Sequence, residues 1–354
     1  MEPKGGGTIA RVGRRKALFQ YTLRRCVSIV VMLFAISIIT FLLFFAIPAD
    51  PAKLTCGKNC TPALIEANRH SLGYDKPMTT QYVNFLKGFV KERDFPDDKK
   101  LEKTNPGSIV HCKAPCLGYS PSQQTTINYI FGRAAPITLS IGLGAFVLWV
   151  FFGVLFGVIS ALRRGKISDK VLLSVSLIGY SFPTFFIGLI ILQIVTYKYS
   201  LLPEPAYVSP FSNPEKWMSG MIGPWITLAA VYAALYVRLT RAKMLETMTE
   251  DYIRTARAKG LSRPRIVIKH GLRAALSPIV TIAGLDLASV IGGTAITESV
   301  FNLDGMGKTV IDAIKNVDLP IIVVGVLIAA AAVIVMNFVV DLLYAAIDPR
   351  VRYT

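Results

Sequence analysis

The side chains that could perform chemistry are few and scattered in this sequence. Its three histidines, His70, His111 and His270, lie far apart, and it contains neither an H-E-x-x-H zinc motif nor a G-x-S-x-G nucleophile motif. Residues 305–309 end like a phosphate-binding loop, but Asn302 stands where that motif needs its first glycine. The sequence therefore predicts neither a catalytic centre nor a nucleotide site.

Four cysteines form two equally spaced pairs in one polar section. Each pair has the pattern C-x3-C: Cys56 with Cys60, and Cys112 with Cys116. In an oxidising compartment an even set of cysteines usually forms disulfides, and four cysteines allow three connectivities. Four thiolates could also hold a metal, although an oxidising compartment argues against it, and free thiols are a third possibility. We expect disulfides and no metal site, with the pairing left open.

Two acidic residues belong to apolar surroundings. Asp286 lies in the middle of one apolar run, and Glu298 follows that run. A charged side chain inside a bilayer is costly, so it normally faces protein or water. A place in a transport pathway and a structural hydrogen bond between helices explain Asp286 equally well. Glu298 is the second pathway candidate, whereas Asp341, near the end of the last run, is expected to be structural.

The elements that must position these groups are long apolar runs. The chain of 354 residues is 53% hydrophobic, with a mean hydropathy of +0.50 and a formal net charge of +17. This composition excludes a soluble domain. Basic residues sit at the ends of the runs, which favours membrane topology over nucleic-acid binding. Each run can cross a bilayer core of about 30 Å. The runs are residues 27–47, 137–162, 171–197, 222–239, 276–296 and 319–343.

These runs predict an all-α polytopic membrane protein with six transmembrane helices. Gly153 and Gly157 form a GxxxG pattern that allows two helices to approach closely, and Pro183 interrupts the third run. No small-residue cleavage site follows the first run, so we expect an uncleaved helix rather than a signal peptide. Lys and Arg in the short loops place both termini in the cytoplasm.

The polar section between the first two runs has mixed charge and is expected to form a small extracytoplasmic subdomain, with helices near 61–72 and 80–90. This gives five expected segments. They are a cytoplasmic tail (1–25), the first transmembrane helix (26–47), the extracytoplasmic subdomain (48–133), the main transmembrane domain (134–345) and a cytoplasmic tail (346–354).

The segment 251–278, between the fourth and fifth runs, has the sequence DYIRTARAKGLSRPRIVIKHGLRAALSP. Short helix-forming stretches flank Gly260, and Lys and Arg recur throughout. Small residues allow close packing, Gly260 permits a turn, and basic side chains can meet acidic or carbonyl groups. The pattern favours a docking segment for another protein. A basic loop that only enforces topology is the simpler alternative.

Several stretches, in order, resemble the permease subunits of ATP-binding-cassette (ABC) importers. They include YTLRRCVSIVVMLFAISIITFLLFFAIPADPA, IGYSFPTFFIGLIIL, TRAKMLETMTEDYIRTARAKGL, TESVFNLDGMGK and DLLYAAIDPRVRY. The resemblance is to the oligopeptide/dipeptide/nickel branch and its first permease type. It implies the type I ABC importer permease fold in a bacterial plasma membrane, and half of a pathway for peptides.

The resemblance also implies partners. They are a second homologous permease, two cytoplasmic ATPases and an extracytoplasmic substrate-binding protein. The chain itself is then no enzyme and carries no cofactor, because ATP and Mg belong to the ATPase subunits. Segment 251–278 resembles the EAA coupling loop that docks on the ATPase. The implied coupling residues are Asp251, Tyr252, Arg254, Thr255, Ala256, Ala258, Lys259, Gly260 and Leu261.

Two features depart from the branch pattern. Asp304 precedes Gly305 where proline is usual, and an insert near 95–124 enlarges the outer face, where it is expected to hold the binding protein or gate the entrance. A stand-alone secondary transporter or channel, coupling ions through Asp286 or Glu298, is the alternative, although no clear internal repeat is visible. A membrane receptor or assembly factor would share the topology. Peptides are the default substrate, with nickel, haem-like and sugar cargo open.

Overall fold

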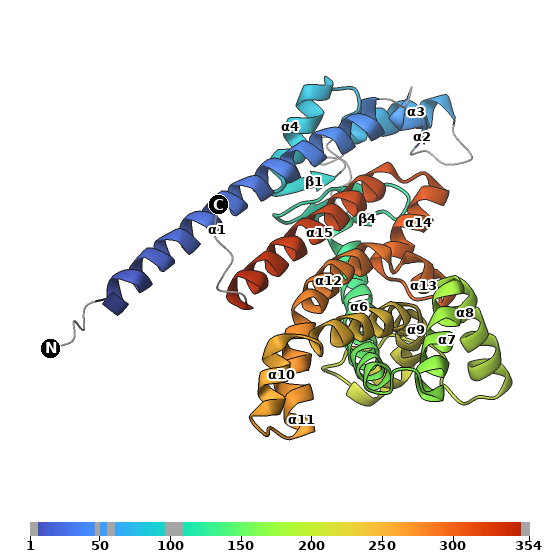
Figure 1. Ribbon diagram of the computed structural model, residues 1–354. Coiled ribbons are helices and arrows are strands. Elements are labelled where there is room, and N and C mark those ends of the chain that lie inside the picture. The colour runs from blue at the N-terminus through green and yellow to red at the C-terminus, as the bar shows by residue number, and fades with distance from the viewer. Residues whose placement is uncertain (1–5, 47–49, 55–60, 96–108, 348–354) are drawn as a thin grey trace.

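The computed structural model describes residues 6–46, 50–54, 61–95 and 109–347. Long helices dominate it, and short strands lie at one end (Figure 1). The first half contains α1 (Gly6–Phe41), η1 (Leu42–Ala46), α2 (Pro51–Leu54), α3 (Pro62–Ser71), α4 (Met78–Gly88), β1 (Arg93–Phe95), β2 (Val110–Cys112), β3 (Tyr119–Ser120), β4 (Thr125–Thr126) and α6 (Ile127–Leu162). The second half contains α7 (Ile167–Ser181), α8 (Thr184–Ile190), η3 (Ile191–Lys198), α9 (Pro214–Thr247), α10 (Asp251–Ala258), α11 (Arg263–Arg265), η4 (Ile266–Leu272), α12 (Arg273–Gly293), α13 (Ala295–Val300), α14 (Met306–Asn316) and α15 (Leu319–Ile347).

Five helical segments among the described residues are long and apolar enough to cross a membrane. They are Thr22–Phe44, Ile127–Leu162, Pro214–Thr247, Arg263–Val290 and Leu319–Leu342. A sixth candidate consists of two helical pieces, Ile167–Ser181 and Thr184–Lys198, which meet at a bend of 102°. The all-α polytopic fold is therefore confirmed, with the sixth span counted only if the bent pair is one span.

The bend falls where the sequence predicts that Pro183 interrupts the third run, residues 171–197. Phe182 has an extended backbone, with φ −85° and ψ 134°, and Pro183 follows it. Proline disfavours the helical conformation in the residue before it and lacks the N–H that would continue the helix. The break at Pro183 thus has a local cause in the sequence.

Two helices begin earlier than the apolar runs predicted. Helix α1 starts at Gly6, so the expected boundary between a tail ending at residue 25 and a helix starting at 26 falls inside one helix. Helix α6 starts at Ile127 rather than near 134, because the Thr126 side chain caps it by accepting a hydrogen bond from the N–H of Tyr129. The helices expected near 61–72 and 80–90 are confirmed as α3 and α4.

The centre of the bundle is the contact between α6 and α9. The GxxxG pattern of α6 lies there: a Cβ on Gly153 would stand 2.3 Å from Cβ of Tyr236, and one on Gly157 would stand 2.5 Å from Cβ of Thr240. Glycine is therefore required for this approach. Trp149 and Tyr236 are fully buried in the adjoining core.

Helices α1 and α15 run side by side along one flank of the bundle (Figure 1). An ion pair joins them, with Arg25 Nη2 at 3.0 Å from Asp341 Oδ2. Both side chains are partly exposed, so the pair contributes little free energy by itself. The contact agrees with the structural role expected of Asp341.

We call the end of the bundle that carries β1–β4 the strand end. Strands β1 and β2 pair antiparallel, with Phe95 opposite Val110, and β3 pairs antiparallel with β4. The residues that follow β2 are tied to α4 and α6. Cys116 N–H donates to Gly88 O at 2.7 Å, and Leu117 N–H donates to Asn128 Oδ1 at 2.8 Å.

The link to α15 goes through a buried carboxylate. Ser120 Oγ donates to Asp318 Oδ2 at 2.5 Å, Ser122 donates to the same oxygen, and Asp318 directly precedes α15. Residues 116–122 are therefore bonded to α4, to α6 and to the residue before α15.

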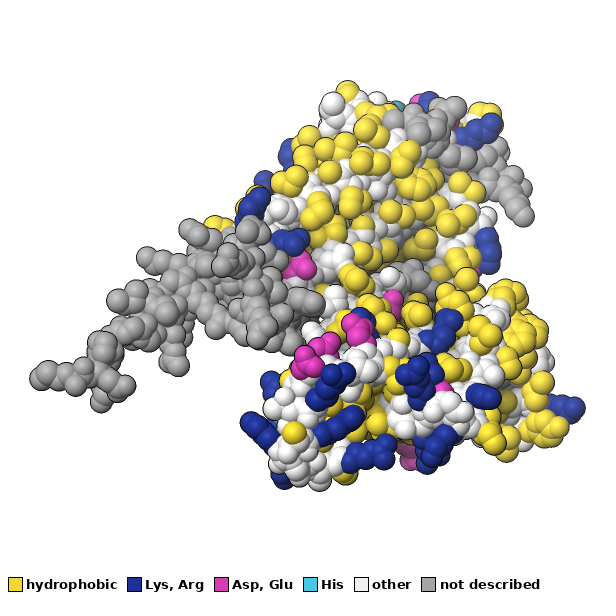
Figure 2. Space-filling model, viewed as in Figure 1, with side chains coloured by type: hydrophobic (Ala, Val, Ile, Leu, Met, Phe, Trp, Pro, Cys, Tyr) yellow, Lys and Arg dark blue, Asp and Glu magenta, His cyan; other side chains and the backbone are white. Residues whose placement is uncertain are grey.

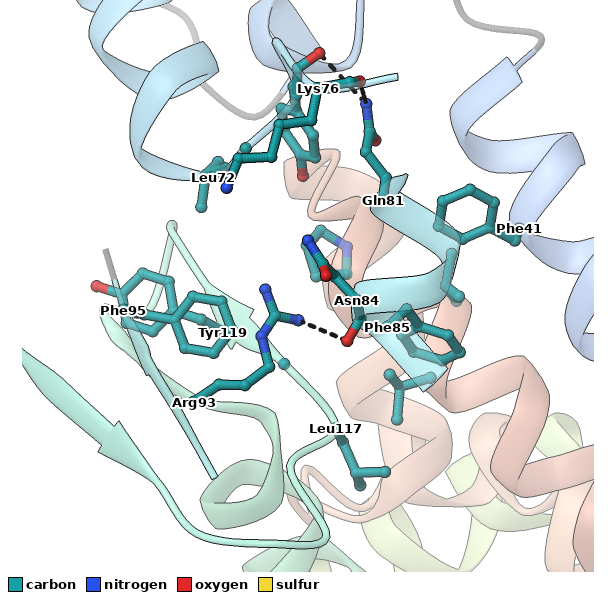
Figure 3. Close-up of a pocket in the computed structure, with 16 residues that line it drawn as sticks. Phe41, Leu72, Lys76, Gln81, Asn84, Phe85, Arg93, Phe95, Leu117 and Tyr119 are labelled. Atoms are coloured by element: carbon teal, nitrogen blue, oxygen red, sulfur yellow. Dashed lines mark hydrogen bonds between the residues drawn. The ribbon is translucent and has the colours of Figure 1, made fainter. Parts of the chain in front are cut away.

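A small cavity of about 100 Å³ remains between the subdomain at the strand end, α1 and α15. In Figure 3 the rings of Phe95 and Tyr119 stack beside it, while Arg93 donates to Asn84 O at 3.3 Å. The cavity is small beside the roughly 300–1,000 Å³ typical of ligand-binding pockets.

We predict that Gly157→Leu destabilises the bundle by about 1–3 kcal/mol or more, because its side chain must enter a closed contact with α9. The matched control is Gly132→Leu in the same helix, where a Cβ meets nothing within 4 Å. The measurement is the thermal midpoint of each purified variant in detergent. Equal midpoints for the two variants would contradict the close approach of α6 and α9.

Candidate functional site

The opposite end of the bundle carries α10 and α11, and we call it the α10 end. The α10 segment, defined here as residues 251–272, projects there beyond the long helices (Figure 1). Lys and Arg side chains gather around it (Figure 2). Exposed basic residues of the segment are Arg254, Arg257, Lys259, Arg263, Arg265 and Lys269. This surface suits an acidic or carbonyl-rich partner.

One face of α10 anchors the segment to the chain. Ile253 is fully buried and Ala256 nearly so, and both pack against Ile266 of η4, with Met248 and Leu261 at the edge. Ile253 and Ala256 are three residues apart and therefore share a helix face. This face holds α10 onto η4, which continues without a break into α12.

The turn after α10 depends on a glycine. Gly260 has φ +73°, and its N–H donates to Arg257 O at 2.9 Å while the next N–H, of Leu261, donates to Ala256 O at 3.3 Å. A left-handed glycine with these bonds is a common helix terminator. A Cβ on Gly260 would meet nothing within 4 Å, so the space outside the turn is open.

The structure separates the nine predicted coupling residues into two groups. Ala256 is buried and Leu261 partly buried, so both pack on their own chain and help to anchor the segment. The remaining predicted residues are exposed: Asp251, Tyr252, Arg254, Thr255, Ala258, Lys259 and Gly260. Ile253 was missed, although its spacing from Ala256 on an otherwise polar helix signals a buried stripe.

The exposed groups are only weakly engaged within the chain. Arg254 Nη1 lies 3.5 Å from Asp251 Oδ1, and both side chains are largely exposed, so this pair costs little to separate. Partial burial, and then the charge of Glu250, raises the pKa of Tyr252 above its ordinary value. These groups can therefore exchange their present contacts for those of a partner.

A buried ion pair stiffens the α10 end behind this segment. Arg241 of α9 forms a bidentate contact with Asp169 of α7, with Nε–Oδ1 at 2.8 Å and Nη2–Oδ2 at 2.9 Å. Ser160 Oγ and the N–H of Gly165 donate to the same carboxylate, at 2.5 Å and 2.8 Å. In the sequence, the basic residues between 163 and 170 indicated only membrane topology. Asp169, the one acid among them, was the available sign of this ion pair.

Asp286 and Glu298, the two pathway candidates, lie in different surroundings. Asp286 of α12 is partly buried, and its Oδ2 accepts a hydrogen bond from the hydroxyl of Tyr236 on α9 at 2.7 Å. The interhelical hydrogen bond considered for Asp286 is thus present. Its place in a pathway stays a prediction.

Glu298 is fully buried and saturated with hydrogen bonds. Its Oε1 accepts from the hydroxyls of Thr138 at 2.6 Å and Thr294 at 2.8 Å, and its Oε2 accepts from the N–H of Lys308 at 2.8 Å. Glu298 therefore holds α6, α13 and α14 together, and its place in a pathway stays a prediction. The loop that resembles a phosphate site lies against it: a Cβ on Gly305 would stand 2.3 Å from Glu298 Cδ.

Asp304, which departs from the branch pattern, takes part in the same loop. Lys308 Nζ donates to Asp304 Oδ1 at 2.6 Å and to Asn302 Oδ1 at 2.8 Å. Lys308, the lysine of the stretch that resembles a phosphate-binding loop, therefore bonds to side chains of its own loop. Beside this loop, between the start of α6 and residues 205–209, lies a cavity of about 950 Å³.

The cysteines are only partly described. A disulfide joins Cys112 to Cys116, within one C-x3-C pair, and both residues are buried beside Phe95. Cys56 and Cys60 lie outside the described residues, so their pairing stays a prediction. Within the described part of the chain, no group of three or more His, Cys, Asp or Glu could hold a metal ion.

Comparison with known proteins assigns the family. Residues 153–353 match the family described as the binding-protein-dependent transport system inner membrane component, and residues 18–142 match the N-terminal family of such membrane components. The chain belongs to this permease family. The permease is accordingly a non-catalytic membrane subunit of an ABC importer, with the type I permease fold, and a stand-alone secondary transporter is not favoured.

Named relatives cover nearly the whole permease. It is 36% identical over 94% of its length to a probable peptide ABC transporter permease protein, y4tP, of Sinorhizobium fredii, of which 99% is covered. It is 33% identical over 95% of its length to the glutathione transport system permease protein GsiC of Escherichia coli K12, of which 100% is covered. A solved structure of the inward-facing MetNI methionine ABC transporter aligns with a TM-score of 0.49 and 18% identity, over 62% of this chain and 97% of that one.

We predict that Glu298→Ala lowers the free energy of unfolding by roughly 2–4 kcal/mol, because two buried hydroxyls and a partly buried N–H lose their acceptor. The exposed Glu204→Ala serves as the control of the same chemistry. Thermal midpoints in detergent measure both. A Glu298→Ala variant as stable as the control would show that the carboxylate does not hold α6, α13 and α14 together.

Proposed function

We propose that this permease forms half of the translocation pathway of an ATP-driven importer for di- and oligopeptides. A second, homologous permease supplies the other half, a substrate-binding protein delivers the peptide, and two ATPases drive the cycle. The observation that carries the substrate class is near-complete coverage of two relatives named for a peptide and for glutathione, itself a short peptide.

The α10 end faces the cytoplasm in this proposal, together with both termini, and the strand end lies outside the bacterial plasma membrane. Two observations support this orientation. Lys and Arg gather at the α10 end (Figure 2), and basic short loops favour the cytoplasmic side. The four cysteine positions then fall in the oxidising compartment, where the Cys112–Cys116 disulfide is stable.

ATPase movement reaches the pathway through α10. The exposed face of α10 and the open turn at Gly260 receive the ATPase, while Ile253 and Ala256 grip η4. Because η4 runs directly into α12, a pull on α10 tilts the helix that carries Asp286. The ATPases can shift the permease between its states only if they bind those states with different free energies.

At the strand end, the insert near 95–124 helps to hold the substrate-binding protein or gates the entrance. The insert is firmly based, because its residues from Val110 to Ser122 pair with β1 and bind Gly88, Asn128 and Asp318. A firm base allows the insert to present a fixed surface to a docking protein. It also allows the insert to be shortened without unfolding the subdomain.

We predict that Gly260→Val abolishes peptide-stimulated ATP hydrolysis and ATPase docking, because the new side chain enters the space where the partner binds. The backbone cost of a non-glycine residue at positive φ is about 1–2 kcal/mol. The control Gly165→Val carries the same cost, since Gly165 has φ +79° and equally open surroundings at the same end.

The assay uses vesicles that contain both permeases and both ATPases, with the binding protein on the side of the strand end. The readouts are ATP-dependent uptake of a labelled peptide and copurification of the ATPase. Loss of both in Gly260→Val, with Gly165→Val near wild type, supports the coupling role. Equal losses in the two variants refute it, and uptake without any ATPase would revive the secondary transporter.

We also predict that replacing residues 96–109 by Asn-Gly weakens docking of the binding protein while the permease still folds. Phe95 and Val110 are directly paired, so a two-residue turn can close the β1–β2 hairpin. The measurement is the concentration of binding protein that gives half-maximal ATPase stimulation. An unchanged concentration together with full uptake would remove the insert from both docking and gating.

A further inference from the structure

Asp286 lies at a face of α12 that the described part of the chain leaves largely uncovered. One side of α12 is closed by α15, because a Cβ on Gly284 would stand 2.0 Å from Val340. The core side is closed too, with Ala283 and Leu287 buried. The remaining face carries the exposed residues Leu285 and Ser289, and Asp286 lies between them on the helix.

This face cannot be turned to lipid. A carboxylate within a membrane-crossing helix is costly unless it meets protein or water, and Asp286 lies within the candidate span Arg263–Val290. In a two-permease importer, a membrane face that avoids lipid meets either the second permease or the water-filled pathway. Asp286 therefore marks the inner side of α12.

The Asp286 carboxylate has a hydrogen-bond partner among the described residues on only one of its two oxygens. The buried hydroxyl of Tyr236 donates to Oδ2, whereas Oδ1 has no hydrogen-bond partner among the described residues. Tyr236 is itself fixed by the close contact of α6 and α9 at Gly153. One turn away on α9, Tyr232 stacks on the buried Trp149 with ring centroids 4.6 Å apart. A rigid aromatic wall thus backs a carboxylate with one free oxygen.

Such a site selects a cation. No Lys, Arg or His in the described part of the chain forms an ion pair with Asp286, although the other acid near a span end, Asp341, has one in Arg25. A hydrogen bond between a carboxylate and an ammonium group is among the strong ones, and nearby aromatic rings favour a cation as well. The one cation common to all unmodified peptides is the α-ammonium group.

We propose that Asp286 binds the α-ammonium group of the peptide as it crosses the membrane and so selects cargo with a free amino terminus. The inference rests on the proposed peptide import. Tyr236 is a positioning residue that orients the carboxylate, while Asp286 makes the contact. A cation of the second permease is the competing partner for the free oxygen, and the experiment separates the two.

The test compares uptake of one labelled tripeptide with uptake of its N-acetylated form in vesicles with the full transporter. For each variant, the ratio of the two uptake rates is divided by the wild-type ratio measured with the same binding protein. Selection by the binding protein then cancels. The variants are Asp286→Asn, which removes the charge, and Asp286→Glu, which keeps it.

Ser289→Lys adds a variant that leaves the carboxylate in place. It sets an ammonium group on the exposed face, three residues from Asp286 and within reach of it. Leu285→Ala on the same face is the control for a change of shape without charge. Copurification of both ATPases normalises every rate to assembled transporter.

We expect Asp286→Asn and Ser289→Lys to lower the relative preference for the free amino terminus roughly tenfold or more, the loss of one charge-assisted hydrogen bond. Asp286→Glu and Leu285→Ala should stay near wild type. Equal loss of both substrates in Asp286→Asn and in Ser289→Lys, or loss of assembly in both, assigns Asp286 to the second permease and overturns the proposal. Unchanged ratios in both variants overturn it too. Absence of ATP-dependent uptake in wild type would instead refute the proposed function.

Discussion

The close approach of α6 and α9 is the constraint on which the rest of the permease depends. Because Gly153 and Gly157 carry no side chain, α9 can lie with Tyr236 and Thr240 directly against the backbone of α6. This contact fixes the rotation and height of α9. The hydroxyl of Tyr236 then points to Asp286, and the next residue after Thr240, Arg241, meets Asp169. A single register thus places a membrane carboxylate and the ion pair of the α10 end.

The α10 end combines a stiff base with a replaceable surface. The carboxylate of Asp169 is satisfied from three elements, so breaking any one contact would leave a buried charge poorly compensated. The α10 helix is held differently, by the apolar side chains of Ile253 and Ala256, while its charged groups have only exposed partners. Apolar anchoring resists a pull without dictating polar contacts. That division suits a segment that must transmit movement and still bind another protein.

Much of this architecture could be read from the sequence, because long apolar runs between basic loops have few structural solutions in a bilayer. Helices α3 and α4, the turn at Gly260 and the break at Pro183 also follow from local rules. The 102° bend could not be predicted, since its size depends on what α7 and α8 pack against. The burial of Glu298 was equally hidden, because its partner Thr138 is supplied by a distant helix. The inward face of α10 was predictable, because Ile253 and Ala256 are three residues apart on an otherwise polar helix.

Glu298 and Asp286 show why an acid in a membrane protein cannot be assigned a role from its position alone. Both belong to apolar surroundings, and both are costly to desolvate. Glu298 recovers that cost internally, since hydroxyls and an N–H of its own chain occupy both oxygens. Asp286 recovers only part, through Tyr236, and keeps one oxygen without a partner among the described residues. A fully satisfied carboxylate fixes a structure in one state. A half-satisfied carboxylate is stabilised when a cation binds its free oxygen. It can release that cation again, because the hydrogen bond from Tyr236 holds the carboxylate with or without the cation.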